Sequence, residues 1–163
     1  MQKKTGLRWL WVTIIVLILD RLTKYFALLY LPPYAEVPIF PHFNLTLAYN
    51  KGAAFSFLNS ASGWQSWLFG AIAILVSVSL LIWLSRLSSR QKWLCVAICL
   101  IIGGALGNLS DRLLYGYVVD FLDFYAVNLH WPAFNIADSA ICIGACMLFF
   151  DALFMKGRAL RSH

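Results

Sequence analysis

The chain has 163 residues, of which 61% are hydrophobic and 12% charged, and its mean hydropathy is +0.75. This composition excludes an ordinary soluble domain and indicates an integral membrane protein. The formal net charge is +6 and the isoelectric point is near 9.3, but the basic residues follow the membrane topology described below, so we expect no nucleic-acid partner.

Four apolar stretches are long enough to cross a hydrocarbon core as helices, which takes about 20 residues. They cover residues 8–31, 64–83, 93–112 and 135–155. A membrane-spanning barrel would need many alternating segments, whereas these runs are continuous. The sequence shows no internal repeat or low-complexity tract. We therefore predict a single integral membrane domain over residues 1–163, an all-α membrane protein with four transmembrane helices.

The first stretch begins with basic residues and an apolar run over residues 9–19, as a cleavable signal peptide does. Asp20, Arg21 and Lys24 follow directly, and no small-residue cleavage pattern is present. We expect this helix to remain in the mature protein.

Two long connections join the helices, over residues 32–63 and 113–134. In the first, residues 43–49 alternate between apolar and polar or small side chains, which is typical of a half-buried strand. Residues 50–52 read as a turn, and Phe55 and Phe57 are candidates for a returning strand. The second connection carries Asp120. The fold expectation is therefore four helices with a small β-containing segment on one face of the membrane.

Basic residues predict the orientation. Most of them fall in three clusters: Lys3, Lys4 and Arg8; Arg86, Arg90 and Lys92; and Lys156, Arg158 and Arg161. Four helices place these clusters on one side of the membrane, which the positive-inside rule assigns to the cytoplasm. Both termini are then cytoplasmic, and the two long connections lie on the outer side.

Helix rise converts sequence position into depth. Counted from the cytoplasmic clusters, Asp20 lies roughly 18 Å along its helix, Asn108 roughly 24 Å and Asp138 roughly 27 Å. In a core about 30 Å thick, all three fall in the outer half, at the level of the connection that carries Asp120. A role in helix packing or interface anchoring is the alternative for such groups, but it does not require a common depth.

Two pairs of polar residues share helix faces. Asp20 and Lys24 are four residues apart and can form an ion pair, and Asn108 and Arg112 have the same spacing. For Arg21 and Asp111, which lie beside these pairs, we favour a structural or interfacial role.

Several reaction types are excluded because the sequence lacks the motifs that they require. The sequence contains no zinc-protease, serine-hydrolase or phosphate-loop motif. The histidines are scattered, and the four cysteines, Cys95, Cys99, Cys142 and Cys146, have no histidine nearby. We expect packing roles for the cysteines, no metal site and no cofactor.

Two carboxylates remain, Asp120 and Asp138. If they lie within about 3 Å of each other, the pair shares one proton. The ionised member can then activate a water while the other protonates the substrate, which is aspartic protease chemistry. Groups able to hold the acids or a substrate are Asn50, Asn108, Asn135 and Arg112, although each Asn is equally compatible with a structural role.

A transporter would also use acidic groups inside the membrane. Against this alternative, the inner half of the helices offers only Asp151, and the sequence has no inverted halves. A purely structural protein would not require the clustered polar groups.

Five sequence blocks carry a family resemblance. They are Asp20-Arg21-Leu22-Thr23-Lys24, Asn50-Lys51-Gly52-Ala53-Ala54-Phe55, residues 103–112, residues 116–121, and Phe134-Asn135-Ile136-Ala137-Asp138. In this order, and over nearly the whole chain, they resemble lipoprotein signal peptidase (signal peptidase II). Ser110 is a mild departure, since a larger apolar residue is expected there.

The resemblance implies a membrane aspartyl endopeptidase of the bacterial inner membrane with its active site near the periplasmic face. It implies removal of the signal peptide from diacylglyceryl-modified prolipoproteins by a cut before the lipidated cysteine, inhibition by globomycin-type compounds, and no metal or cofactor. Asp120 and Asp138 become the catalytic pair. The site-lining or supporting residues become Asn50, Asn108, Arg112, Asn135, Asp20 and Lys24. Which aspartate holds the shared proton stays open.

Overall fold

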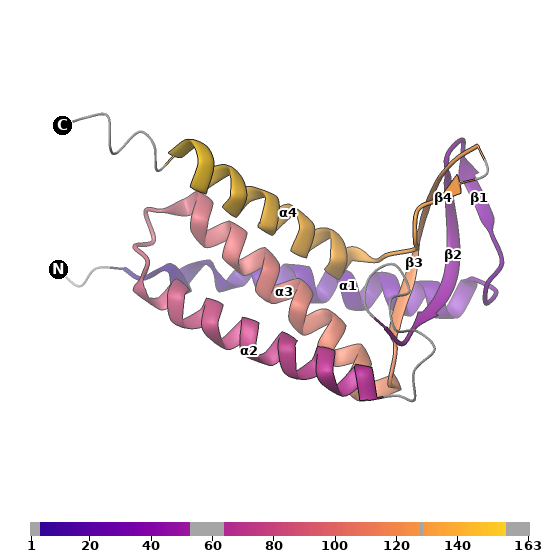
Figure 1. Cartoon of the computed structure of the whole chain (residues 1–163), viewed down its shortest axis with the longest axis horizontal. Helices are drawn as coiled ribbons and strands as arrows, with labels where there is room; N and C mark the ends of the chain where they lie inside the picture. The colour runs from indigo at the N-terminus through magenta and orange to yellow at the C-terminus, as the bar shows by residue number, and fades with distance from the viewer. Residues whose placement is uncertain (1–3, 53–63, 128, 156–163) are drawn as a thin grey trace.

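The computed structural model describes residues 4–52, 64–127 and 129–155, and in these ranges long helices lie side by side with a small sheet at one end (Figure 1). After a short 3-10 helix, Gly6–Trp9, the elements are α1 (Leu10–Tyr30), β1 (Val37–Phe40), β2 (Phe43–Asn50), α2 (Trp64–Arg86), α3 (Lys92–Tyr115), β3 (Val118–Ala126), β4 (Leu129–His130) and α4 (Ile136–Phe150), which continues into a π-helical turn, Asp151–Met155. The two ends of the chain lie at the end of the helices away from the sheet (Figure 1).

Helix α3 is the centre of the helical part and packs against α1, α2 and α4. Small residues allow this close approach. A Cβ added to Gly104 would collide with the backbone oxygen of Ala137 on α4, and one added to Gly144 would lie 2.6 Å from the oxygen of Ala97. Where lipid replaces water, such small residues let helix backbones come together and gain dispersion contacts.

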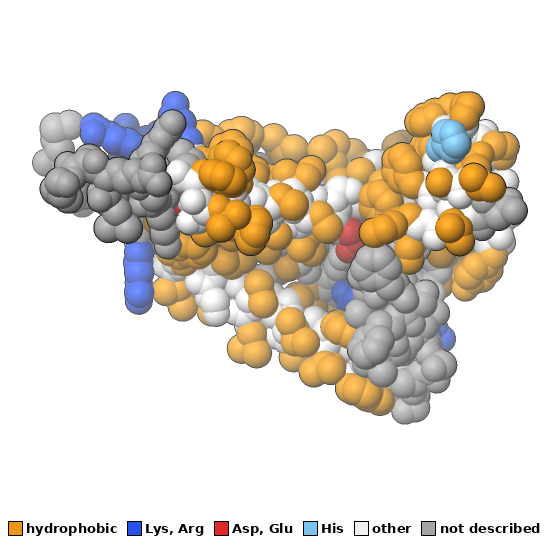
Figure 2. All heavy atoms as spheres, turned by 45° about the horizontal axis from the view of Figure 1, so that its top comes forward, with side chains coloured by type: hydrophobic (Ala, Val, Ile, Leu, Met, Phe, Trp, Pro, Cys, Tyr) orange, Lys and Arg blue, Asp and Glu red, His pale blue; other side chains and the backbone are white. Residues whose placement is uncertain are grey.

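Three helical segments are long and apolar enough to cross a membrane by length and composition: Trp64–Arg86, Lys92–Tyr115 and Ile136–Phe154. The outward side chains of the helices are largely apolar (Figure 2), as expected where lipid is the solvent. Helix α1 has a similar length but carries three charged residues, Asp20, Arg21 and Lys24, between its midpoint and the end near the sheet. Three of the four expected spans therefore meet the criterion.

The sheet is antiparallel with strand order β1-β2-β3-β4. The strand expected over residues 43–49 is confirmed as β2. The all-α description is wrong in one respect, because the second connection contains β3, whose residues Val118–Ala126 make it the longest strand described. Asp120 and Asp123 lie three residues apart in this strand. They therefore break the alternation of period two by which a half-buried strand is predicted from sequence. The return strand expected at Phe55 and Phe57 falls outside the described residues.

A turn at Gly116 connects the end of α3 to the start of β3. Helix α3 continues past its expected end at residue 112 to Tyr115, and Gly116 ends it with a φ of 78°, in the left-handed region. The register then pairs Ala48 with Asp120 and Asn50 with Val118. Leu47, Val119 and Phe121 pack on Ala27 of α1, which fixes the sheet to the helix ends.

Candidate active site

Asp120 lies on β3 and is 2% exposed, at the junction between the sheet and the helix ends. Its two carboxylate oxygens accept hydrogen bonds from two side-chain amides. Asn135 Nδ2 donates to Oδ1 at 2.7 Å, and Asn50 Nδ2 donates to Oδ2 at 3.0 Å. Asn50 is the register partner of Val118, so strand pairing brings its amide to this carboxyl group.

Asp138 lies in the first turn of α4 and forms a capping box with Asn135. The side chain of Asn135 accepts from the Asp138 backbone N–H at 2.9 Å, while Asp138 Oδ2 accepts from the Asn135 backbone N–H at 3.3 Å. Asn108 Nδ2 donates to Asp138 Oδ1 at 2.7 Å. The positive end of the helix dipole at this turn favours a negative charge here.

Asn135 joins the two acids. Its Nδ2 donates to Asp120 Oδ1, to Asn108 Oδ1 at 3.2 Å and to Val119 O at 3.2 Å, and its backbone N–H donates to Asp138. A single side chain therefore bonds both aspartates from the N-cap position of α4. The common depth of Asp120 and Asp138 deduced from helix rise is matched by this shared partner.

The electrostatics of Asp120 suit proton transfer. Burial, and after it the nearby carboxylate of Asp138, raise the pKa of Asp120 to about 7, against the opposing effect of the hydrogen bonds from Asn50 and Asn135. A carboxyl group with this pKa exchanges its proton near neutral pH, as general acid–base catalysis requires.

A cavity of about 590 Å³ opens beside Asp138. Its polar lining comes from Asn50, Asn108, Arg112, Asp138 and Ser139, and its apolar lining is mainly Val118, Trp131, Phe134, Ile141 and Ile143. Asp120 lies behind Asn50 and Asn135 rather than in this lining. A few polar groups at the end of an apolar cleft are typical of a site for a small or extended ligand.

Arg112 holds main chain rather than a carboxylate. Its Nη1 donates to Asn108 O at 3.3 Å and its Nη2 to Gly52 O at 3.2 Å, and its guanidinium lies 5.5 Å from the centre of the Phe69 ring. Of the two roles expected for it, fixing a loop or fixing a carboxylate, the described contacts support the first. Arg112 also borders a second cavity of about 460 Å³ between α2 and α3.

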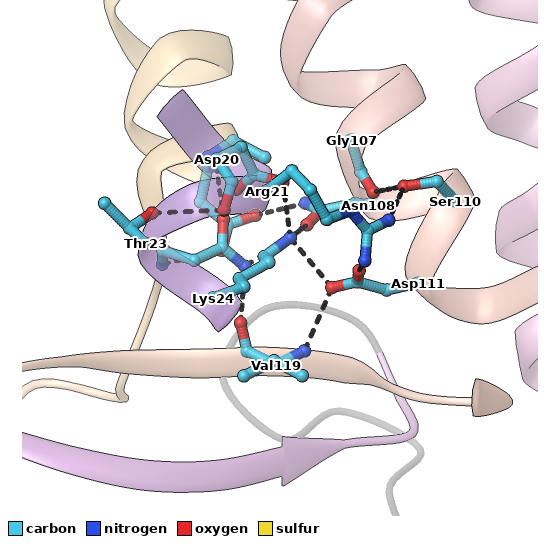
Figure 3. Close-up of polar contacts among 12 residues, drawn as sticks. Asp20, Arg21, Thr23, Lys24, Gly107, Asn108, Ser110, Asp111 and Val119 are labelled. Carbon is cyan, nitrogen blue, oxygen red and sulfur yellow. Dashed lines mark hydrogen bonds and ion pairs between the residues drawn. The ribbon is translucent and has the colours of Figure 1, made fainter. Parts of the chain in front are cut away.

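A buried charge cluster adjoins the two aspartates (Figure 3). Lys24 Nζ lies 2.8 Å from Asp20 Oδ2 and 2.8 Å from Asp111 Oδ2, and all three side chains are at most 2% exposed. The expected pairing of Asp20 with Lys24 is confirmed. Asp111, for which we favoured a structural or interfacial role, is a full member of the cluster and links α3 to α1, in agreement with a structural role. Its position three residues after Asn108, on one helix face, is the signal that could have revealed it.

Two expectations about other polar residues need correction. Cys95 and Cys99 are buried in the helical core, as a packing role requires, but Cys142 and Cys146 are exposed, and Cys142 lines the larger cavity. His130 is not isolated either. Its ring Nδ1 lies 3.0 Å from both oxygens of Asp123, and its Nε2 lies 3.9 Å from Glu36.

The three residues Glu36, Asp123 and His130 place possible metal-ligand atoms within 4.8 Å of one another. Sequence spacing gives no hint of this group, because Glu36 precedes β1 whereas Asp123 lies on β3 and His130 on β4, and these segments come together only in the folded protein. The hydrogen bond between His130 Nδ1 and Asp123 accounts for the position of the ring, while its Nε2 lies near Glu36 beyond hydrogen-bond distance. Asp123 also accepts from Asn44 Nδ2 at 3.1 Å.

A family model described as "Signal peptidase (SPase) II" matches residues 12–154. The chain belongs to the signal peptidase II family. Relatives named "Lipoprotein signal peptidase" are 54% identical in Alteromonas mediterranea, covering 95% of this chain and 85% of the relative, and 53% identical in Photorhabdus laumondii, covering 91% and 89%.

Solved structures agree with this membership. One, described as a bacterial membrane enzyme at 2.3 Å resolution, is 32% identical with a TM-score of 0.86, covering 100% of this chain and 98% of that chain. Another, at 1.9 Å, is 31% identical with a TM-score of 0.81, covering 94% and 99%. The resemblance in the five sequence blocks is thus confirmed. The chain is a protease and a multi-pass bacterial membrane protein, which displaces the transporter and structural alternatives.

Proposed function

We propose that this protein is an aspartyl endopeptidase that removes the signal peptide from diacylglyceryl-modified prolipoproteins, cutting before the lipidated cysteine. Asp120 and Asp138 form its catalytic pair. The observation that carries the proposal is that Asn135 bonds both carboxyl groups, the buried one of Asp120 and the half-buried one of Asp138, beside an apolar cavity. The name of the relatives, lipoprotein signal peptidase, supports the substrate class.

The reaction uses the pair asymmetrically. Asp138 lines the cavity and lies in the first turn of α4, where the helix dipole favours a negative charge, so it acts as the ionised base. It takes a proton from a water whose oxygen attacks the scissile carbonyl carbon. Asp120, with its pKa near 7, donates its proton to the carbonyl oxygen. Asp138 then passes the proton it took from water to the leaving nitrogen, the C–N bond breaks as the tetrahedral intermediate collapses, and Asp120 takes back a proton from the hydroxyl oxygen that becomes the new carbonyl.

The supporting residues have separate tasks. Asn50, Asn108 and Asn135 hold the carboxyl groups by their amides. Arg112 fixes the turn at Gly52 at the edge of the cavity. The carboxylates suffice to activate water, so the reaction needs no metal or cofactor, and full activity in a strong chelator is the expected result.

Membrane placement follows from the basic residues. We assign α1 as the fourth span, with both termini in the cytoplasm and the carboxyl pair at the periplasmic face. Basic side chains gather at the helix end away from the sheet (Figure 2), in agreement with this orientation. Alkaline phosphatase fused after Ala126 should be active, and the same reporter fused after Ser88 should be inactive. The opposite pattern would place the site on the wrong side for an exported substrate.

The lipid on the substrate is part of recognition. Each buried CH₂ contributes about 0.8 kcal/mol to membrane anchoring, so two acyl chains hold the modified cysteine at the depth of the site while membrane lipid surrounds the helices. This restraint lowers the entropic part of the barrier. The apolar lining of the larger cavity fits a signal peptide and the chains next to it, and a globomycin-type inhibitor would compete there.

Lipid-modified and unmodified forms of one precursor test the substrate assignment. Both are supplied at equal concentration in the same detergent, and the mass of the released fragment locates the cut. We expect fast cleavage of the modified form immediately before its cysteine and little cleavage of the other. Equal rates would make the protein a general membrane peptidase.

A further inference from the structure

The amide of Asn108 is held in one orientation by its neighbours (Figure 3). Its oxygen accepts from Lys24 Nζ at 3.2 Å and from Asn135 Nδ2 at 3.2 Å, while its nitrogen donates to Asp138 Oδ1 at 2.7 Å. An ammonium group has donors only. A flipped amide would therefore turn its NH₂ group toward Lys24 and its oxygen toward a carboxylate, losing an attractive contact at each end.

Lys24 itself cannot reach a substrate. It is 1% exposed, lies outside the lining of both cavities beside Arg112, and is held at 2.8 Å by each of Asp20 and Asp111. Any influence of Lys24 on the reaction must pass through the groups that it bonds.

Those two carboxylates also hold the backbone on which the catalytic pair is mounted. Asp20 Oδ1 accepts from the N–H of Ala137 at 3.0 Å, one residue before Asp138. Asp111 Oδ2 accepts from the N–H of Val119 at 3.2 Å, one residue before Asp120. One ammonium group thus braces both chain segments that deliver the acids, through elements far apart in the sequence.

We infer that Lys24 is a positioning residue for the proposed reaction: it locks the Asn108 amide with its NH₂ toward Asp138 and thereby keeps the negative charge of the catalytic pair on that residue. The inference rests on the proposed function. An N–H bond to a carboxylate favours its ionised form, whereas a carbonyl oxygen at the same place disfavours it. The charged groups around Asp138 come from α1, α3 and β3: Lys24, Asp20, Asp111, Arg112 and Asp120.

Lys24→Gln tests the inference, with kcat and KM measured on a lipid-modified precursor over a range of pH. The neutral side chain can donate or accept, so it no longer dictates the direction of the Asn108 amide. We expect kcat to fall about 100-fold, the effect of losing one oriented donor. The KM should stay within about twofold, because Lys24 lies outside both cavities beside Arg112, and the acidic limb of the profile should move up by about one pH unit.

Arg21→Gln is the matched control. Arg21 Nη1 lies 3.4 Å from Asp111 Oδ1 and its Nη2 donates to Ser110 Oγ at 2.7 Å, so the described polar contacts of Arg21 go to Asp111 and Ser110 rather than to Asn108. This variant removes a positive charge from the same cluster, so it should lower stability and leave the pH profile in place. An equal shift in Arg21→Gln would mean that net charge, rather than the oriented amide, sets the profile, and would overturn the inference.

A second variant keeps the test decisive if Lys24→Gln does not fold. Lys24→Gln combined with Asp111→Asn removes one positive and one negative charge, so the buried charge stays balanced. It should show the same loss of kcat and the same shift of the acidic limb. Wild-type kcat and pH profile per folded enzyme in either variant would leave Lys24 a structural residue only. Failure of the proposed function is distinguishable, because Asp120→Asn and Asp138→Asn would then remain active whatever Lys24 does.

Discussion

Two polar clusters lie next to each other in this protein and differ in the charges that they bring together. In the first, Lys24 lies between Asp20 and Asp111, with Arg21 at the edge, so that opposite charges balance. In the second, Asp120 and Asp138 are like charges whose hydrogen-bond donors are neutral amide groups.

This difference indicates different tasks: the charge cluster around Lys24 holds the elements together, whereas the pair Asp120 and Asp138 is proposed to carry out the reaction. A balanced buried cluster holds α1, α3, α4 and β3 together through side-chain and backbone bonds. A pair of like charges beside a cavity opposes folding, and its presence in a membrane protein is explained by function. The clusters meet at Asn108, which accepts from Lys24 and donates to Asp138.

The largest expected effect comes from removing either catalytic carboxyl group. Asp120→Asn and Asp138→Asn keep the shape and remove the ionisable acid, so activity should fall on the order of 10⁴-fold. Folded yield should remain close to wild type, because an amide can still bond to the surrounding groups. Cleavage of lipid-modified precursor by purified protein is the measurement. Turnover within tenfold of wild type in either folded variant would break the distinction between the clusters.

The charge cluster should respond in the opposite way. Asp111→Ala removes an ion-pair partner of Lys24 and the acceptor of the Val119 N–H bond. Breaking a buried ion pair from one side destabilises a protein by about 3–5 kcal/mol. Thermal unfolding in detergent should show a large loss of stability. Asp111→Asn is the milder companion, since its amide oxygen can still accept from Val119. Equal stability of wild type and Asp111→Ala would mean that the cluster does not hold the fold.

The stability of the folded protein should depend on pH because of Asp120, and the sign of this dependence can be stated. The pKa of Asp120 is raised to about 7 in the folded protein, chiefly by burial and then by the charge of Asp138. The folded state therefore binds this proton more tightly than the unfolded chain does. The resulting stabilisation is present below the ordinary carboxyl pKa and is lost as pH rises through about 7.

Asp120→Asn removes this titration. Relative to wild type, the variant should gain roughly 2–4 kcal/mol of stability between pH 4 and pH 8. Melting temperatures of both proteins at several pH values measure the difference. Asp151→Asn, far from the pair at the other end of α4, serves as the control and should show no such trend. A difference in melting temperature between wild type and Asp120→Asn that stays constant across this range would contradict the raised pKa of Asp120.

Much of the site was accessible from sequence because helix rise is constant. Counting residues along three helices placed Asp20, Asn108 and Asp138 at one level, and the structure joins all three through Asn108, Lys24 and Ala137. Spacing within one helix was equally informative, as the pairing of Asp20 with Lys24 shows.

The rest depends on contacts between segments that no local pattern encodes. The strand β3 was missed because its buried aspartates interrupt the apolar alternation, and the groups that compensate their burial are amides from β2 and the N-cap of α4, together with the ring of His130. The joining role of Asn135 had one local signal, an Asn three residues before an acid at a helix start, which is a variant of the capping box. The convergence of Glu36, Asp123 and His130 depends on the fold of the sheet, since the pairing of β3 with β4 brings His130 near Asp123 and Glu36 comes from the segment before β1.

The smallest predicted effect sharpens the boundary of the charge cluster. A Cβ added at Gly107 would lie 2.8 Å from Asp20 Oδ2 and 3.2 Å from the Cβ of Ala137, so Gly107→Ala must displace the acid that braces Ala137. Overpacking of this kind destabilises by about 1–3 kcal/mol. Gly70→Ala is the matched control, because its added Cβ would meet only Leu109 at 3.4 Å, an ordinary contact. Both variants carry the same helix-propensity gain. Melting temperatures in one detergent should therefore place Gly107→Ala below wild type and Gly70→Ala at or above it. A Gly107→Ala protein as stable as Gly70→Ala would show that Asp20 can move without loss, and that the cluster is less tightly packed than its distances indicate.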